Sequence, residues 1–373
     1  MTKPSIYDIT PEKWPSAVAE MGLKSFSARQ IQEWLYQKHV STFEEMTNLA
    51  KTTRELLAET YDIPGMTVAD EQLATDGTHK FAWALADGQK IESVLIPSDF
   101  ESLNDRSLGV AGGGVNPKRR TLCISTQAGC AMGCTFCRTA TMGLMRNLTH
   151  GEIVGQIVEV NRRIHNTIGP ITNIVLMGMG EPLANYSNMV QALRTMYSPH
   201  GLKITQRKIT LSTVGIAPAI KRLADEPNMH VKLALSLHAV NDEIRKTLIP
   251  MANRYPMQEI MDACRYYVEK HPRDRVTFEY LLIAGVNDRK SDADGLAKLI
   301  AHIPAKVNLI PFNPFPGNSW ERPSDEVISQ FSEWVHAKHI QVNIRVSRGR
   351  EILAACGQLA QESSRKNVTE MSF

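Results

Sequence analysis

The sequence lacks the features of a membrane or secreted protein. No apolar run approaches the roughly 18 residues needed to cross a bilayer, and the opening residues MTKPSIYDITPEKW lack the apolar core of a signal peptide. Six cysteines among 373 residues are too few for a disulfide scaffold, so we expect a reducing compartment in which any disulfide is transient and catalytic. The composition therefore predicts a globular, cytoplasmic protein without a membrane partner.

Charge of one sign is not in large excess either, because the formal net charge is only +3. Overall charge therefore does not require a polyanionic partner. Basic residues do cluster locally, and such clusters either contact phosphates or form ordinary solvated surface. The clusters are Lys118, Arg119 and Arg120; Arg207 and Lys208; Arg245 and Lys246; and Arg345, Arg348 and Arg350.

Three of the six cysteines form one compact motif. Cys130, Cys134 and Cys137 lie in the run GCAMGCTFC, and three thiolates on one loop can bind three irons of a [4Fe-4S] cluster, leaving the fourth iron open to an exchangeable ligand. Zinc is the alternative, but such zinc sites use a second ligand pair downstream, whereas Cys264 and Cys356 are single. The spacing CxxxCxxC resembles the signature of radical S-adenosylmethionine (SAM) enzymes, in which the open iron binds the amino and carboxylate groups of SAM.

Residues 1–65 are expected to form a small helical unit. Ser27 with Gln30, and Thr42 with Glu45, each fit the capping-box pattern, which predicts a short helix beginning at each of these two points.

Residues 80–97 alternate polar and apolar side chains around Asp87 and Gly88, the pattern typical of a β-hairpin. Residues 98–120 are polar and contain three consecutive glycines, so we expect a flexible loop or linker there.

Short β-rich runs alternate with helical stretches from residue 121 onward. This alternation predicts an α/β fold with a parallel sheet. About six βα units are too few for a complete eight-unit barrel, and they fit an open partial (β/α)6 barrel with its active site at the carboxyl ends of the strands. The expected strands are 122–126, 171–177, 208–212, 231–237, 276–283, 307–311 and 342–346, and the expected helices include 151–164 and 256–270.

Candidate ligand-binding residues follow several of these strands. The glycines of MGMGEP, the run that contains Gly180 and Glu181, allow the backbone to approach a ligand such as a cofactor amino group, although the run alone also fits a simple turn. His238 alone would more often be a hydrogen-bonded structural histidine, but its place at a strand end favours a ligand site. The other strand-end candidates are Ser212 and Thr213, Ser236 and Leu237, and Asn313.

The remaining cysteines are isolated from the triplet. Cys123 lies on the first expected strand, and Cys356 lies in AACGQL, where the adjacent glycine indicates an exposed loop. Neither is readily explained by packing. Cys264 lies in an expected helix with Met261 and Tyr267, and we expect it to be buried as a small apolar side chain.

These segments together resemble one family, the bacterial dual-specificity ribosomal RNA and transfer RNA adenine carbon-2 methyltransferases. The resemblance extends over nearly the whole chain, including the N-terminal helical unit and the run IESVLIP. It is carried by TLCISTQAGCAMGCTFC, MRNL, ITNIVLMGMGEPL, KITLSTVG, LSLHAVNDEIR, VNLIPFNPFPG and AACGQLA.

The resemblance implies a radical SAM enzyme with a [4Fe-4S] cluster held by Cys130, Cys134 and Cys137. The implied partners are 23S rRNA, tRNA and an electron donor such as flavodoxin. The implied SAM contacts are Gly180, Glu181, Ser212, Ser236, Leu237, His238 and Asn313. We expect the chain to divide into a helical RNA-binding unit (1–65), a hairpin and linker (66–120), the partial barrel (121–347) and a C-terminal segment with a methyl-carrying cysteine (348–373).

Members of such a family use two lone cysteines. One SAM methylates the residue matched by Cys356, and a second SAM yields a 5'-deoxyadenosyl radical that takes a hydrogen from the new methyl group. The methylene radical adds to carbon 2 of adenine, and Cys123 helps resolve the resulting protein–RNA crosslink, leaving a disulfide with Cys356. Glu92 matches a proton acceptor. A radical route suits carbon 2 because this carbon is electrophilic and does not react with a cationic sulfonium by polar transfer.

Two other functions fit parts of the pattern. A related family methylates carbon 8 of the same ribosomal adenine and shares the cluster and both lone cysteines; the full N-terminal unit and TLCISTQ favour carbon 2, although regiochemistry depends on how adenine is posed. A non-enzymatic RNA-binding protein with a structural metal is the other alternative. The stretch 98–120 is longer than expected for the family and is interpreted as a local insertion near the RNA surface, beside the neighbourhood of Glu92.

Overall fold

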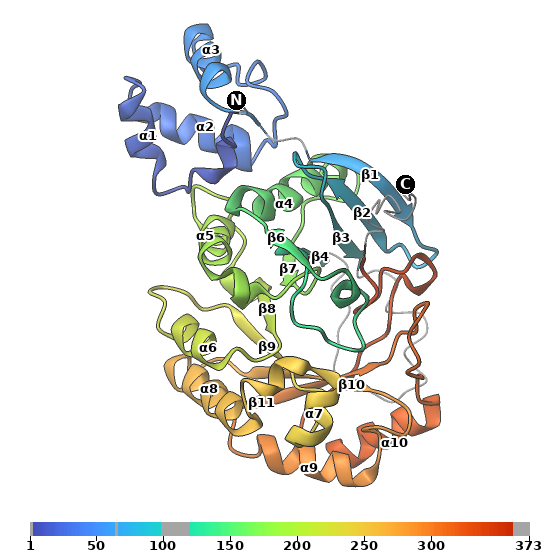
Figure 1. Cartoon of the computed structure of the whole chain (residues 1–373). Coiled ribbons are helices and arrows are strands. Elements are labelled where there is room, and N and C mark those ends of the chain that lie inside the picture. Colours follow the sequence, from blue (N-terminus) through green and yellow to red (C-terminus); the bar gives the residue numbers. More distant parts are fainter. Residues whose placement is uncertain (1–2, 64–65, 98–118, 361–373) are drawn as a thin grey trace, which may run out of the picture.

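The computed structural model describes residues 3–63, 66–97 and 119–360. In this part of the chain a 10-stranded sheet has the order β1-β2-β3-β4-β7-β8-β9-β10-β11-β12, and a second sheet consists of β5 and β6. Figure 1 shows the N-terminal helices above one end of this sheet, with further helices along its outer side.

The N-terminal unit is helical, but its helices do not begin where the capping pattern predicts. Ser27 lies buried inside a helix that begins at Phe26. The Glu45 carboxylate accepts hydrogen bonds from the backbone N–H groups of Ser41 and Thr42, at 2.9 Å each, yet no helix follows. The helix predicted at Ser27 is therefore present and begins slightly earlier, whereas the start predicted at Thr42 is wrong, because such side-chain hydrogen bonds also close turns outside helices. The elements are η1 (Ile6–Asp8), α1 (Trp14–Glu20), α2 (Phe26–Tyr36) and α3 (Lys51–Thr60).

The expected hairpin is confirmed as β2 (His79–Ala84) and β3 (Lys90–Pro97), which pair antiparallel. The sequence analysis missed β1 (Thr67–Leu73), which pairs with β2 and is largely exposed, so that it shows no apolar alternation. β3 also pairs with β4 (Arg120–Cys123). The hairpin therefore continues the barrel sheet. The expected loop at 98–120 lies outside the described residues up to residue 118, and its last residue already belongs to β4.

Within the 10-stranded sheet the strands from β4 onward are parallel, which confirms the expected α/β architecture. In the described part of the chain β1 and β12 are the two edges of the sheet, so the barrel is open. These strands are β4, β7 (Asn173–Leu176), β8 (Ile209–Thr213), β9 (Lys232–Ser236), β10 (Val276–Leu282), β11 (Ala305–Pro311) and β12 (Val342–Ile344). The first expected strand is too long, because β4 ends at Cys123 and the next residues lead into β5 (Gln127–Gly129), which pairs with β6 (Leu144–Asn147).

Amphipathic helices cover the outer face of the sheet, as Figure 1 shows for the sequence from green to orange. α4 begins with a capping box in which Thr149 and Glu152 each bond the other's backbone. Its apolar residues Ile153 and Ile157 are fully buried, and each contributes about 1.5–3 kcal/mol on burial. The helices are α4 (His150–Ile164), α5 (Tyr186–Tyr197), α6 (Ala217–Ala224), α7 (Asp242–Leu248), α8 (Met257–Lys270), α9 (Lys290–Ile300) and α10 (Asp325–His336).

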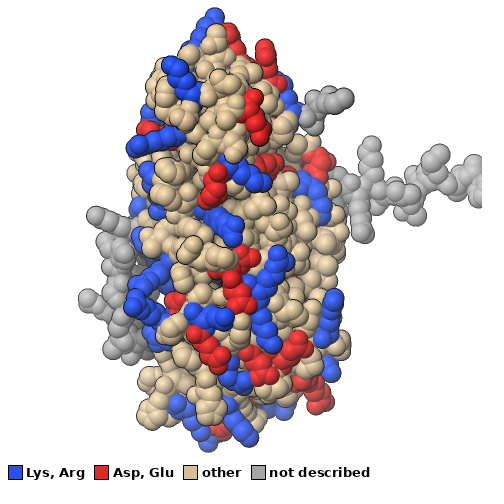
Figure 2. Space-filling view, turned by 90° about the vertical axis from the view of Figure 1, so that its left-hand side faces the viewer, with Lys and Arg blue, Asp and Glu red and all other residues tan. Residues whose placement is uncertain are grey.

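The surface carries both signs of charge. Figure 2 shows one face of the molecule, on which Lys and Arg side chains lie among Asp and Glu side chains. Among the described residues, no helix has both the length and the apolar composition needed to span a membrane.

Candidate active site

The cysteine triplet lies on a loop that packs against the carboxyl ends of β10 and β11. Cys134 is buried in one apolar cluster with Leu281 and Ile310. The thiols are close enough to affect one another: burial raises the pKa of Cys130 to about 12, with a further increase from Cys137. Burial also raises the pKa values of Cys134 and Cys137. Thiols in such surroundings stay protonated until a metal displaces the proton.

A tight backbone turn sets the start of this loop. Gly129 has φ +76°, and a Cβ there would lie 1.9 Å from the carbonyl oxygen of Gly143. Only glycine fits this turn. The next residue, Cys130, donates its N–H to the same carbonyl at 2.8 Å. From the same loop, the Thr135 N–H donates to Leu248 O at 3.0 Å. The rings of Phe136 and His238 pack edge to face, with their centroids 4.9 Å apart.

Strand pairing places a row of polar residues on one face of the sheet. Ser236 lies beside Glu279, Glu279 beside Asn308, and Asn308 beside Asn343. Laterally paired residues share a face, so this row crosses four neighbouring strands. Ser212 belongs to the same face, because it lies beside Ala234, two positions before Ser236 on β9.

Cys123 and Glu92 also belong to this face. Cys123 lies beside Val175, and Val175 beside Thr210, two positions before Ser212. On the other side Cys123 lies beside Val94 of β3, two positions after Glu92. The Glu92 side chain is 3% accessible and lies 3.6 Å from the ammonium of Lys80. The sheet therefore brings together predicted residues that are far apart in the chain.

The GxGEP turn is built around a side chain from β5. Gly180 has φ +98°, and a Cβ there would lie 2.5 Å from Cβ of Gln127. Gln127 Oε1 accepts the Glu181 N–H at 2.8 Å. The Glu181 carboxylate accepts the N–H groups of Leu183 at 3.1 Å and Val214 at 2.9 Å. Burial nevertheless raises the pKa of Glu181 to about 7, so this acid is poised to exchange a proton near neutral pH or to bind an ammonium group.

His238 and Leu237 form a rigid strand end. His238 is buried with φ +58°, its Nδ1 accepts the Leu281 N–H at 3.0 Å, and burial lowers its pKa to about 3. It is therefore neutral. The Leu237 side chain is fully buried, and its N–H donates to Glu279 O at 3.0 Å, so only its backbone borders the polar face.

Arg245 was expected in a basic surface cluster, and that interpretation is wrong. The side chain is 1% exposed and its guanidinium donates to Leu237 O and Ser236 O, at 3.2 Å each, and to Val214 O. Burial lowers its pKa to about 10. Arg245 thus fixes the ends of β8 and β9. A basic pair such as Arg245 and Lys246 gives no local signal that one member is buried.

Asn313 follows β11 and connects the barrel to the C-terminal segment. Its Nδ2 donates to the Cys356 carbonyl at 3.2 Å, whereas its Oδ1 is buried without a hydrogen-bond partner among the described residues. An unpaired buried acceptor is costly. Asn313 therefore offers the kind of acceptor that an ammonium or hydroxyl donor of a cofactor would satisfy.

The C-terminal segment lies against the cysteine loop. Arg138 donates its N–H to Gly357 O at 2.7 Å, and Thr139 donates its hydroxyl to Leu359 O at 2.5 Å. Cys356 directly precedes Gly357 in a turn and is half-buried. It is close enough that a negative charge on it would raise the pKa values of both Cys137 and Cys123. The structure thus brings the two lone cysteines together beside the triplet. As expected, Cys264 is fully buried in α8.

The donor set fits an iron–sulfur cube. In the described residues no three His, Cys, Asp or Glu side chains surround a single metal-ion position. Each thiolate of a cube binds a different iron, so the three cysteines do not need a common centre. The nearby unpaired Asn313 Oδ1 and the Glu181 carboxylate are suitable partners for the polar groups of SAM.

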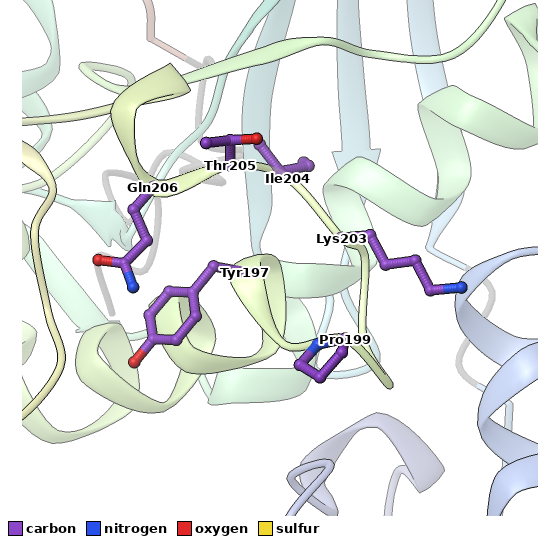
Figure 3. Close-up of a pocket in the computed structure, with 6 residues that line it drawn as sticks. All are labelled: Tyr197, Pro199, Lys203, Ile204, Thr205 and Gln206. Atoms are coloured by element: carbon purple, nitrogen blue, oxygen red, sulfur yellow. The ribbon is translucent and has the colours of Figure 1, made fainter.

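Two surface pockets lie away from these residues. One, of about 360 Å³, is shown in Figure 3 and is lined by Tyr197, Pro199, Lys203, Ile204, Thr205 and Gln206. The other, of about 280 Å³, extends from Lys203 to Tyr36 and His39 of the N-terminal unit. Neither pocket contains a thiol or a carboxylate, so we do not place the chemistry there.

Comparison with known proteins agrees with this geometry. Residues 124–296 match the model of the radical SAM superfamily, and residues 5–63 match the ribosomal RNA large subunit methyltransferase N-terminal domain. The dual-specificity RNA methyltransferase RlmN of Anaeromyxobacter dehalogenans is 42% identical over 96% of this chain and 92% of its own length. RlmN of Nautilia profundicola is 41% identical over 98% of this chain and 100% of its own length.

A solved structure shows the same fold. The radical SAM methyltransferase from Sphaerobacter thermophilus superposes with a TM-score of 0.87 at 43% identity, covering 95% of this chain and 98% of that protein. This confirms the expected radical SAM fold, and radical SAM enzymes use a [4Fe-4S] cluster together with SAM. The chain belongs to the RlmN family of dual-specificity RNA methyltransferases, within the radical SAM superfamily.

Proposed function

We propose that this radical SAM RNA methyltransferase methylates carbon 2 of adenine in 23S rRNA and tRNA through a methylated cysteine. Cys356 carries the methyl group, Cys123 resolves the crosslink, and Cys130, Cys134 and Cys137 bind the cluster. One observation carries the proposal: the C-terminal segment lies on the cysteine loop, so that Cys356 interacts electrostatically with both Cys137 and Cys123.

The remaining site residues have roles that follow from their placement. When bound, the cluster supplies the electron that cleaves SAM reductively. Glu181, Asn313 and the strand-end groups of Ser212, Ser236, Leu237 and His238, together with the Gly180 turn, hold the polar groups of SAM. Glu92 lies on the same sheet face as Cys123, where it can take the proton that leaves carbon 2.

The structure also suggests how the rest of the chain contributes. We propose residues 1–65 as the RNA-binding unit, 66–120 as the hairpin and linker, 121–347 as the barrel and 348–373 as the methyl-carrying segment. Adenine must leave its stack to reach a barrel mouth, which costs a few kcal/mol, so folded RNA with an exposed adenine is the preferred substrate. The enzyme would act in the cytoplasm, with a small electron-transfer protein such as flavodoxin as donor.

Substitution of the lone cysteines tests this function. Cys356→Ala should give neither methylated RNA nor a covalent adduct, because no methyl group is loaded. Cys123→Ala should load the methyl group and join it to adenine, and then stall as a nuclease-sensitive protein–RNA adduct that survives a denaturing gel. Cys264→Ala, which removes a buried thiol of α8 that has no proposed role in the reaction, is the matched control and should methylate normally.

The outcomes separate the alternatives. Near-normal methylation by both Cys123→Ala and Cys356→Ala would mean that these cysteines only pack, and an adduct in Cys356→Ala would refute its role as carrier. Mass mapping of the modified adenosine distinguishes carbon 2 from carbon 8. Iron and sulfide analysis of anaerobically purified Cys130→Ala, Cys134→Ala and Cys137→Ala checks the cluster ligands, each of which should be indispensable.

A further inference from the structure

Arg345 follows β12 and was not predicted as a site residue. Its N–H donates to Leu309 O at 2.8 Å, which extends the pairing of β12 with β11. It lies two positions after Asn343, which belongs to the polar row on the sheet face. The side chain is 29% accessible and its Nη1 lies 3.9 Å from the carboxylate of Glu279. The guanidinium therefore lies over the polar face of the barrel.

The same guanidinium reaches across the barrel to the residue that contacts Cys123. Arg345 Nη1 donates to the thioether sulfur of Met177 at 3.5 Å. Met177 in turn makes a backbone hydrogen bond to the Cys123 sulfur, which favours the thiolate. Arg345, Met177 and Cys123 thus form a connected path between opposite sides of the open barrel.

Both lone cysteines lie within the field of Arg345. The Cys356 thiolate, the Glu279 carboxylate and the Cys123 thiolate all raise the pKa of Arg345, and Cys356 contributes most. Conversely, burial raises the pKa of Cys123 to about 12, a Cys356 thiolate raises it further, and Arg345 lowers it. Among the described residues, the charged and titratable groups that act on Arg345 and Cys123 include one another, Cys356 and Glu279, and Glu279 is also influenced by Lys306.

We propose that Arg345 is a positioning residue whose charge serves the thiolate of Cys123 as it resolves the crosslink formed at Cys356. This inference rests on the function proposed above. Its basis is the order of events, because alkylation converts Cys356 into an uncharged thioether. The repulsion between the two sulfurs then disappears while the guanidinium remains, so Cys123 is favoured to ionise at the stage when it must attack.

The resolving step balances without an outside oxidant. The Cys123 thiolate attacks Sγ of Cys356, and the disulfide bond forms as the carbon–sulfur bond of the adduct breaks. The electron pair of that bond goes to the methylene carbon, which takes a proton and becomes the methyl group. The two sulfur atoms together lose two electrons and the carbon gains two. The step therefore depends on the thiolate of Cys123, and hence on Arg345.

The decay of the protein–RNA adduct measures this step separately from its formation. The holoenzyme is mixed with SAM, a reductant and RNA, and the adduct is followed by denaturing gel in a single turnover from mildly acidic to mildly alkaline pH. In Arg345→Gln, adduct decay should be about tenfold or more slower at neutral pH, since each pKa unit changes the thiolate fraction tenfold. The deficit should shrink as the pH rises. Arg345→Lys should retain most of the wild-type rate.

Controls distinguish a charge effect from a structural one. Arg348→Gln changes a neighbouring arginine that donates to Pro97 O at 2.7 Å, and adduct decay should be unchanged. Glu279→Gln removes the carboxylate near the guanidinium, so decay should be as fast as in the wild type or faster; if Arg345→Gln yields no adduct, this variant carries the test. If the Arg345–Glu279 ion pair had only a structural role, adduct decay would be slower in both Arg345→Gln and Glu279→Gln.

Three results would overturn the proposal: a deficit in Arg345→Gln that does not change with pH, Arg345→Lys as slow as Arg345→Gln, or slower decay in Glu279→Gln. The variant Cys123→Ala distinguishes a failure of the Arg345 proposal from a failure of the proposed methyltransferase mechanism. Its adduct should persist at every pH, and if no adduct accumulates in that variant, the resolving role of Cys123 fails whatever Arg345 does.

Discussion

Gly180→Ala should strongly destabilise the cofactor loop, because two costs coincide there. The residue has φ +98°, and its Cβ would lie 2.5 Å from Cβ and 2.8 Å from the backbone nitrogen of Gln127. The backbone conformation costs about 1–3 kcal/mol for alanine, and the overlap costs about 1–3 kcal/mol more. The lower entropy of the unfolded chain recovers about 0.4–1 kcal/mol. The expected net loss is therefore about 1–6 kcal/mol, centred on about 3 kcal/mol.

Gly285→Ala is the matched control. Its φ is +71°, and a Cβ there would meet no atom within 4 Å, so only the backbone cost applies and the expected loss is about 1 kcal/mol. Urea denaturation of both variants, with SAM titration, measures the difference. SAM affinity should fall in Gly180→Ala, because moving Gln127 disturbs its 2.8 Å hydrogen bond to the Glu181 N–H, and should be unchanged in Gly285→Ala. Equal stability and equal affinity of the two variants would refute the close-packing argument.

Three further predictions concern buried polar groups. Because the folded pKa of Glu181 is raised to about 7, its contribution to stability is complete below the unfolded pKa of about 4.3. This contribution, about 4 kcal/mol, is lost as the pH rises from there to the folded pKa of about 7. Glu181→Gln should remove this slope, as measured by denaturation of the cluster-free protein at several pH values, and unchanged slopes would contradict the assignment. Asn313→Ala should weaken SAM binding about tenfold in calorimetry, whereas Asn313→Asp, which keeps the acceptor, should bind SAM more tightly than Asn313→Ala; equal losses would contradict a role for Oδ1. Lys80→Met should cost about 3 kcal/mol by removing the ion-pair partner of buried Glu92, and Lys80→Met/Glu92→Gln should recover part of this loss in thermal unfolding; no recovery would show that the charge is not the cause.

The sequence was sufficient to predict the type of chemistry and the type of fold. The spacing of Cys130, Cys134 and Cys137 identifies a loop of thiolates without any reference to distant residues. Likewise, the alternation of apolar strands and amphipathic helices predicts a parallel sheet, because each element's periodicity reflects its own burial. The hairpin at Asp87 and Gly88 was predicted for the same reason. These signals are local, so they can be recognised without knowing which distant segment packs against the element.

Features that depend on partners could not be read in the same way. β1 was missed because an exposed edge strand has no apolar alternation, and the capping pattern at Thr42 and Glu45 fails because the same hydrogen-bonding residues stabilise turns. Arg245 was taken for surface charge, although three carbonyl groups from two strand ends surround its guanidinium. The errors at β1 and Arg245 concern residues whose environment comes from another part of the chain.

The sequence by itself therefore determined which groups the protein has, namely a thiolate triplet, two lone cysteines and strand-end polar residues. Tertiary structure alone decided that Cys123, Ser212, Ser236 and Glu279 share one face of the sheet, and that the segment carrying Cys356 lies on the cysteine loop. The physical reason is that register and docking are set by hydrogen bonds between strands and loops distant in sequence. The periodicity of a sequence indicates whether a side chain is buried or exposed, but it does not indicate which charged groups will lie next to that side chain.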